Sequence, residues 1–476
     1  MRPLDSLDDL PASIGRPAYD RRALRPGIVH IGVGAFHRAH QAVYTDDALA
    51  HRFEAWGIVG ASLRSRDIAQ ALARQNGLYS VVTRDRAGDG ARVVGAIVEA
   101  IAAADDGGRL LSRLADPAIR IVTLAVSEKA YGIHPATGGL DPAHPAVAHD
   151  LARPDAPAGA VGYLVEGLAR RRRAGVAPFT VLCCDNLPAN GRVVRRLVLE
   201  MADRRDAGLA AWIEAHGRFP CSMVDRIVPA ATDETRARAA RLLGRDDALA
   251  VEAEAFSQWV IEDDFVSGRP AWEAGGALFV DDVAPYETMK LRLLNGAHTL
   301  IAHLGRARGL ELVRDVMAEP DAEALVRRLM RAAAATLGPV PGINLDDYCD
   351  RLIERFANPA IAHRTLQIAM DGSQKMPLRI FAPAAEALAA GDDGDAFAYV
   401  TALWLAHVVR TEALDDPRAG ELRRAAANAA RTDGLAAPFF AIDGLFPPAL
   451  AANPAWRGRL DAHLRAILAG RTAGAD

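Results

Sequence analysis

In the N-terminal half of the chain, short apolar runs alternate with longer segments whose apolar positions recur at helical spacing. The apolar runs 28–31, 57–63, 119–126 and 179–184 predict strands, and helices are expected at 35–50 and 159–173. Strands that alternate with helices indicate an α/β fold with a Rossmann-like, doubly wound parallel sheet. Ligands of such sheets bind at the carboxyl ends of the strands.

Beyond about residue 286 the pattern becomes mainly helical. Segments rich in alanine, leucine and arginine, such as 322–337 and 396–410, show helical periodicity and few β-branched runs. The sequence therefore predicts a dinucleotide-binding domain over 1–283 and a mainly α-helical substrate and catalytic domain over 284–476. We expect both domains to contribute residues to the active site.

Composition excludes several functional classes. The 476 residues carry a net charge of −4, which argues against nucleic-acid binding. No apolar run reaches about 18 residues, and the polar N-terminus lacks the core of a signal peptide, so we expect a cytoplasmic protein without membrane contact. Four cysteines without a C-x-x-C pair predict neither a disulfide scaffold nor a zinc site.

The first predicted strand ends in the start of a dinucleotide fingerprint. Gly32 permits a tight turn, and Gly34 lets the backbone approach a pyrophosphate at the helix N-terminus. His37 takes the place of the third glycine. Asp67, after the second strand, is the candidate partner of the NAD ribose. Its neighbour Arg66 leaves tolerance of NADP open, and Asp67 as a mere helix N-cap is the alternative.

A second group of candidate residues lies in the segment 286–298. Only three of the 56 basic residues are lysines, and one of them, Lys290, stands here. On a helix turning about 100° per residue, Glu287, Asn295 and His298 lie within about 140° of Lys290. Such a polar group mixed with leucines favours a helix that faces a cleft. The alternative is a solvated face with a Glu287–Lys290 pair.

This set suits hydride transfer between an alcohol and a nicotinamide. Lys290 is the candidate base, since a buried lysine amine titrates near neutrality more readily than a guanidinium. Asn295 and Asn186 offer amide donors to a developing alkoxide. His298 orients the hydroxyl, and Glu287 relays the proton to water. No metal is expected, because two nearby histidines without a third ligand are weak evidence for one.

The motifs at 32–41, 184–186, 223–226, 290–298 and 371–375 resemble the polyol-specific long-chain dehydrogenase/reductase, or mannitol dehydrogenase, family. The resemblance covers nearly the whole chain. It implies a zinc-independent, NAD-dependent, monomeric enzyme with Lys290 as base, Asn186 and Asn295 as oxyanion hole, and Glu287 on the proton path. His298 and Asp225 would contact a small sugar acid or polyol. The remaining expected positions are Phe36, Arg38 and Glu128 for the cofactor, and Val224, Arg364 and Lys375 for the substrate.

The substrate is expected from finer motifs. Mannitol 2-dehydrogenases have an arginine where this chain has Gln367, and the segments 219–232 and 363–375 are more similar to fructuronate reductases. This similarity implies interconversion of D-mannonate and D-fructuronate, with the carboxylate bound by Lys375 and Arg364 or Arg379. Mannitol 2-dehydrogenase and D-arabinitol 4-dehydrogenase activities are the alternatives. A non-catalytic nucleotide-binding regulator is the alternative from another class.

Overall fold

The computed structural model describes residues 1–85, 88–429, 431 and 434–472. The chain divides into two compact units, Met1–Val283 and Ala284–Asp476, and each is described by itself. No helix among the described residues is long and apolar enough to cross a membrane.

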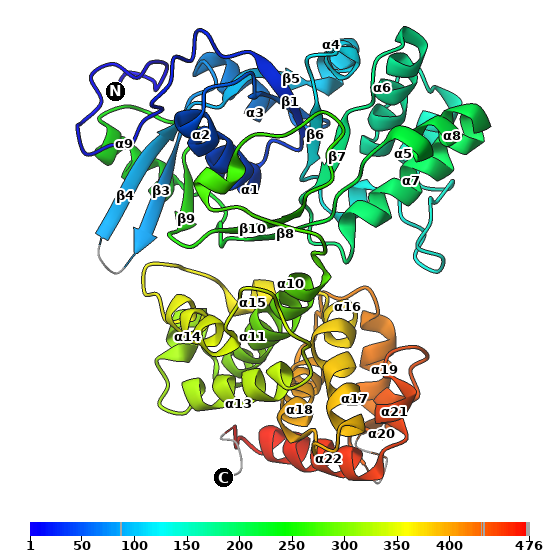
Figure 1. Ribbon diagram of the computed structural model, residues 1–476. Helices are drawn as coiled ribbons and strands as arrows, with labels where there is room; N and C mark the ends of the chain where they lie inside the picture. Colours follow the sequence, from blue (N-terminus) through cyan, green and yellow to red (C-terminus); the bar gives the residue numbers. More distant parts are fainter. Residues whose placement is uncertain (86–87, 430, 432–433, 473–476) are drawn as a thin grey trace. The chain divides into compact units, whose positions relative to one another are not determined.

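The first unit is built on a five-stranded parallel sheet in the order β5-β2-β1-β6-β7 (Figure 1). Its strands are β1 (Pro26–Ile31), β2 (Gly57–Ser62), β5 (Ile97–Ala102), β6 (Ile121–Leu124) and β7 (Thr180–Cys183). The chain builds outward from β1 through β2 to β5 and then returns to β6 on the other side of β1. This reversal opens the crevice in which doubly wound sheets bind their ligands.

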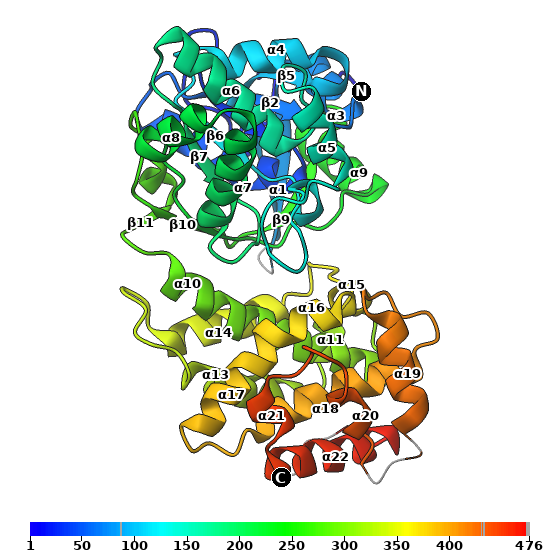
Figure 2. The ribbon, with the colours of Figure 1, turned by 90° about the vertical axis from the view of Figure 1, so that its right-hand side faces the viewer.

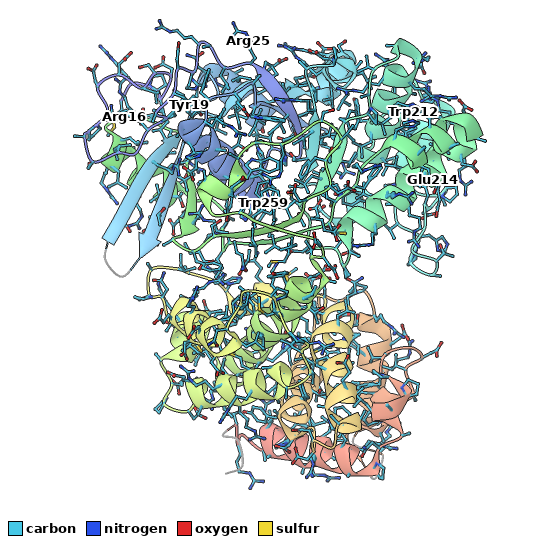
Figure 3. The ribbon with its side chains drawn as sticks, viewed as in Figure 1. Arg16, Tyr19, Arg25, Trp212, Glu214 and Trp259 are labelled. Atoms are coloured by element: carbon cyan, nitrogen blue, oxygen red, sulfur yellow. The ribbon has the colours of Figure 1, made fainter. Side chains whose placement is uncertain are left out.

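Helices cover both faces of this sheet. The helices of the unit are α1 (Ala35–Ala39), α2 (Gln41–His51), α3 (Asp67–Arg74), α4 (Ala103–Ala115), α5 (Pro145–Ala152), α6 (Ala160–Ala174), α7 (Asn190–Arg205), α8 (Ala207–His216) and α9 (Asp233–Leu243). One core joins the sheet to α4, α6 and α7, and another joins it to α2 and α3 (Figure 2). Trp259, in the second core, is completely buried (Figure 3). The predicted Rossmann-like fold is confirmed.

Two smaller sheets complete the first unit. They consist of β3 (Tyr79–Asp85), β4 (Gly88–Val94) and β9 (Val251–Glu254), and of β8 (Ser222–Asp225), β10 (Gln258–Glu262) and β11 (Leu278–Val280). β8 pairs antiparallel with β10, which sets Asp225 opposite Gln258. This pairing fixes the end of β8, where two of the expected substrate residues stand.

The second unit is helical, as predicted. Its helices are α10 (Ala284–Met289), α11 (Gly296–Arg308), α12 (Val313–Met317), α13 (Ala322–Ala334), α14 (Leu345–Phe356), α15 (Thr365–Ala369), α16 (Gly372–Met376), α17 (Ala382–Ala389), α18 (Asp395–Arg410), α19 (Ala419–Ala429), α20 (Ala437–Phe440), α21 (Pro448–Ala451) and α22 (Pro454–Leu468). Two π-helical segments, η3 (Lys290–Asn295) and η4 (Pro377–Phe381), contact each other. The most buried helices, α11 and α18, pack together at the centre.

Two segments depart from the helices expected from sequence. The expected helix 35–50 is divided at His40, whose dihedral angles of φ −127° and ψ −91° are not helical. The expected helix 286–298 is a succession of α10, η3 and α11. A π turn bonds residues five apart, so the uniform rotation assumed for an α-helix does not hold there.

Candidate active site

The loop after β1 has the geometry of a dinucleotide cradle. Gly32 has a φ of +101°, and a Cβ there would lie 2.2 Å from the Ala125 carbonyl oxygen. Gly34 is the N-cap of α1, and a Cβ there would meet one atom within 4 Å, the Gly32 carbonyl oxygen at 3.7 Å. A side chain at Gly32 would therefore distort the turn, and a side chain at Gly34 would fill the space beside the turn. The loop fits a bound pyrophosphate.

The buried His30 contacts the backbone of this loop. His30 makes contacts of 2.7 Å from Nδ1 to the Thr123 hydroxyl and 3.1 Å from Nε2 to the Gly32 carbonyl. Burial lowers the pKa of His30 to about 3, so the ring is neutral. Since a carbonyl only accepts, Nε2 donates to Gly32 and Nδ1 accepts from Thr123. His37, at the third-glycine position, stacks on His30 with ring centroids 3.3 Å apart.

The two predicted cofactor residues of α1, Arg38 and Phe36, differ in burial and in their contacts. Arg38 is buried at 5% exposure, donates to the Val33 carbonyl at 3.0 Å and lies over the ring of Tyr79. Its guanidinium therefore contacts the backbone of the glycine loop itself. Phe36 is half-buried and stacks on His40.

The two predicted cofactor carboxylates lie beyond the carboxyl ends of the strands on either side of β1. Asp67 is the first residue of α3, and Arg66, which pairs with Asp105 at 2.6 Å, holds the N-cap position. The N-cap interpretation of Asp67 is therefore wrong. Glu128 begins the short helix η1 (Glu128–Ala130) after β6. Both carboxylates are exposed. Their contact with a cofactor stays a prediction.

Asn186 follows β7 and is exposed. Its neighbour Asp185 accepts hydrogen bonds from the backbone amides of Val126 and Ser127, both at 3.0 Å, and from the Tyr131 hydroxyl at 2.6 Å. Asn190 donates to the Asp185 carbonyl at 3.0 Å. These contacts fix the backbone on both sides of Asn186.

Asn190 also ties this loop to β8. Its amide nitrogen donates to the Ser222 carbonyl at 2.8 Å, and its oxygen accepts from the Ser222 amide at 3.0 Å. At the other end of β8, Val224 and Asp225 are buried. The candidate residues of the first unit thus stand on strands and loops held by buried hydrogen bonds.

In the second unit, η3 changes the relation of Lys290 to its neighbours. Lys290 is 8% exposed, whereas Glu287 and Asn295 are half-buried. Because a π turn bonds residues five apart, it brings Asn295 close to one full turn from Lys290. The angle between the two side chains about the helix axis is therefore smaller than the about 140° expected for an α-helix, and they lie on the same face.

His298 lies in the first turn of α11, the helix that follows η3. Its ring packs against Phe356 and His363, with centroids 4.6 and 5.3 Å away, and its buried Nε2 has no hydrogen-bond partner among the described residues. Burial, followed by the nearby basic groups His363, Arg355, Arg379 and Lys290, holds the pKa of His298 well below its usual value. A neutral imidazole with a spare polar atom can bond a substrate hydroxyl.

The other predicted substrate residues of the second unit, and Arg379, are basic. Arg379 on η4 donates to the Thr299 hydroxyl at 3.3 Å, and burial lowers its pKa to about 10. Lys375 donates to the carbonyls of Ile368 and Met370 at 3.2 and 2.6 Å, and burial together with Arg379 lowers its pKa. One of the three ammonium donors of Lys375 is left for another acceptor. Arg364 is exposed at the start of α15.

Sequence reasoning assigned no role to the residues that hold the loops carrying Gly32 and Asn186. His30, Asp185 and Asn190 contact the loops that carry Gly32 and Asn186. The signal was present for Asp185, which stands beside Asn186 at the end of a predicted strand. Within the described part of the chain, no group of three or more His, Cys, Asp or Glu side chains is placed to hold a metal ion.

Comparisons with known proteins cover nearly the entire chain. The mannitol dehydrogenase Rossmann domain matches residues 26–274, and the mannitol dehydrogenase C-terminal domain matches residues 282–468. D-mannonate oxidoreductase of Escherichia coli is 41% identical over 96% of both chains. Mannitol 2-dehydrogenase of Cereibacter sphaeroides is 44% identical over 82% of this chain and 83% of its own.

A solved structure agrees with these matches. Mannitol 2-dehydrogenase of Pseudomonas fluorescens, in a ternary complex with NAD and D-mannitol, superposes with a TM-score of 0.87 at 36% identity. The similarity covers 99% of this chain and 97% of that one.

Proposed function

The chain belongs to the mannitol dehydrogenase family of oxidoreductases, and from that premise we propose that it interconverts D-mannonate and D-fructuronate with NAD. NAD supplies the acceptor of the hydride. The glycine loop after β1 and the carboxylates Asp67 and Glu128 would hold this cofactor. The similarity to D-mannonate oxidoreductase extends over 96% of both chains, which supports a sugar-acid substrate.

The observation that carries the choice of a sugar acid is the charge around His298. Arg355 and Arg379 are among the basic groups that lower the pKa of His298. Arg379 also lowers the pKa of Lys375, on which the carboxylates Asp371, Asp415 and Asp416 act in the opposite direction. A cationic surrounding of this kind favours an anionic ligand. A hexonate carries a carboxylate that Lys375, with Arg364 or Arg379, would bind through charge-assisted hydrogen bonds.

The proposed chemistry assigns one task to each polar residue. The neutral amine of Lys290 takes the proton from the secondary hydroxyl of the substrate. Asn186 and Asn295 donate amide hydrogens to the oxygen as negative charge develops on it. His298 bonds the same hydroxyl through Nε2 and orients it, and Glu287 passes the proton from Lys290 toward water.

Oxidation of a substrate panel tests this function. The purified chain is given NAD, and separately NADP, with D-mannonate, D-mannitol or D-arabinitol, and the reduced cofactor is followed by absorbance. We expect D-mannonate with NAD to give the highest kcat/KM. A higher value with D-mannitol or D-arabinitol would assign the chain to the corresponding polyol activity. Binding of NADH without turnover of any compound would favour the alternative of a non-catalytic nucleotide-binding regulator.

A further inference from the structure

Ser127 has a backbone conformation that side chains rarely adopt. Its dihedral angles are φ +77° and ψ 152°, in a region populated essentially by glycine. The residue lies three positions after the end of β6 at Leu124 and directly before Glu128, which is expected to bind the cofactor. Such strained residues persist only where the surrounding structure holds them, and they cluster at ligand clamps.

The carboxylate of Asp185 provides the contacts that hold Ser127. Oδ1 accepts from the Ser127 amide and Oδ2 accepts from the Val126 amide, each at 3.0 Å. The buried hydroxyl of Tyr131 donates to Oδ2 at 2.6 Å and fixes the rotation of the carboxylate. Both oxygens are thus engaged with the same short loop.

Asp185 is also tied to the neighbouring loop. β6 and β7 are adjacent parallel strands with Leu124 opposite Cys183, so their following loops begin side by side. The Asp185 carbonyl accepts from Asn190 and from the Leu187 amide at 2.8 Å, and the next residue in the chain is Asn186. One residue therefore joins the loop that carries Glu128 to the loop that carries Asn186.

We propose that Asp185 is a positioning residue. It holds Ser127 in its strained conformation and thereby fixes the position of the loop after β6, which carries Glu128, relative to Asn186. This inference rests on the proposed function, because that function assigns the cofactor and the developing alkoxide to these two loops. Asp185 itself needs no contact with either. Its role is to keep the two loops preorganised, which ties cofactor affinity to turnover.

The first test replaces one oxygen of the carboxylate. Asp185→Asn presents an NH2 group to one of the two backbone amides, so that amide loses its acceptor. NADH binding, measured by fluorescence titration, is expected to weaken about tenfold, and kcat is expected to fall as well. In the protein without cofactor, the amides of Val126 and Ser127 are expected to exchange hydrogen faster than in the wild type.

A second variant separates positioning from a general structural defect. Glycine takes the Ser127 conformation without the steric penalty of a Cβ. Ser127→Gly in the Asp185→Asn background is therefore expected to recover a measurable part of the lost NADH affinity. Asp206→Asn is the matched control, since Asp206 also accepts a hydrogen bond from a backbone amide, that of Gly208 at 2.8 Å, but is the N-cap of α8. It should leave NADH affinity unchanged.

The outcomes distinguish this inference from the proposed function. Wild-type NADH affinity and wild-type amide exchange in Asp185→Asn would overturn the positioning role, as would the absence of any recovery by Ser127→Gly. If Asp185→Asn fails to fold, Tyr131→Phe removes one of the three bonds to the carboxylate and is expected to weaken NADH binding to a smaller degree. Wild-type protein that binds no NADH would refute the proposed function, while the amide exchange would still test Asp185.

Discussion

Lys290 is buried in a chain that has 53 arginines and three lysines, whereas Lys129 is exposed and Lys375 is half-buried. An arginine at this place would keep a positive charge but could not release its proton near neutral pH. The retained lysine, the adjoining π turn and the neutral His298 therefore support one interpretation, in which the amine acts as a base toward the substrate.

Lys290→Ala is expected to lower kcat by about 10²–10⁴-fold, the usual contribution of a positioned general base. NADH affinity should stay close to that of the wild type, because the cofactor is assigned to the first unit. Lys290→Arg is the matched variant, since it keeps a long basic side chain that cannot give up its proton to act as a base, and it should be equally inactive. Initial rates and NADH titrations measure both effects. Loss of NADH binding in either variant would make Lys290 structural.

Arg364→Gln tests the proposed carboxylate contact. Its KM for D-fructuronate should rise about tenfold, since a charge-assisted hydrogen bond is lost, while its rate with D-fructose should change little. Arg331→Gln on α13 is the control, because Arg331 is also exposed and lies outside the candidate site. An equal rise in KM for both sugars would exclude a specific role for Arg364.

At the scale of elements, the glycine loop and the π segment are the parts that create the site. The two glycines of the loop differ, because a Cβ at Gly32 would lie 2.2 Å from the Ala125 carbonyl oxygen, whereas a Cβ at Gly34 would make only an ordinary contact of 3.7 Å with the Gly32 carbonyl oxygen. Gly32 is therefore required for packing of the loop, whereas Gly34 is expected to be required for binding of the pyrophosphate.

This difference predicts opposite effects of the same substitution. Gly32→Ala should destabilise the protein, because its φ of +101° and the Ala125 carbonyl both exclude a Cβ. Gly34→Ala should keep the wild-type melting temperature and weaken NADH binding about tenfold, since the methyl group fills the pyrophosphate space. Thermal unfolding and NADH titration read the two effects. A stable Gly34→Ala variant with unchanged affinity would contradict the assigned pyrophosphate position.

The same elements show how far sequence reasoning reaches. The strands β1, β2, β6 and β7 and the glycine loop follow from local patterns, since apolar runs and glycines leave direct signals in the chain. The π turn at 290–295 and the break at His40 do not, because both depend on tertiary contacts that overrule helical periodicity. Arg38 was expected at the cofactor and is buried beneath the loop, which no one-dimensional pattern distinguishes.

At the scale of the whole molecule, buried neutral histidines occur in both units. Burial lowers the pKa of His30 in the first unit to about 3 and that of His407 in the second to about 4. Since the unfolded chain binds these protons near pH 6.5, it gains protons before the folded state does. Stability is therefore present above pH 6.5 and is lost as the pH falls toward the folded-state values.

His407→Gln isolates one such contribution. Between pH 7 and pH 5 the wild type should lose about 2 kcal/mol more unfolding free energy than the variant, because the buried imidazole resists protonation. His216→Gln, at an exposed histidine, should behave like the wild type. Urea unfolding at the two pH values measures the difference. An equal acid loss in wild type and His407→Gln would show that His407 takes up its proton in the folded state.

The substrate preference of the intact chain tests the central claim most directly. Initial NADH oxidation by the purified protein is measured with D-fructuronate and, separately, with D-fructose, and the two kcat/KM values are compared. The cationic surrounding of His298 and the similarity to D-mannonate oxidoreductase predict a clear preference for D-fructuronate. A preference for D-fructose would contradict the sugar-acid function and place the chain among the mannitol 2-dehydrogenases.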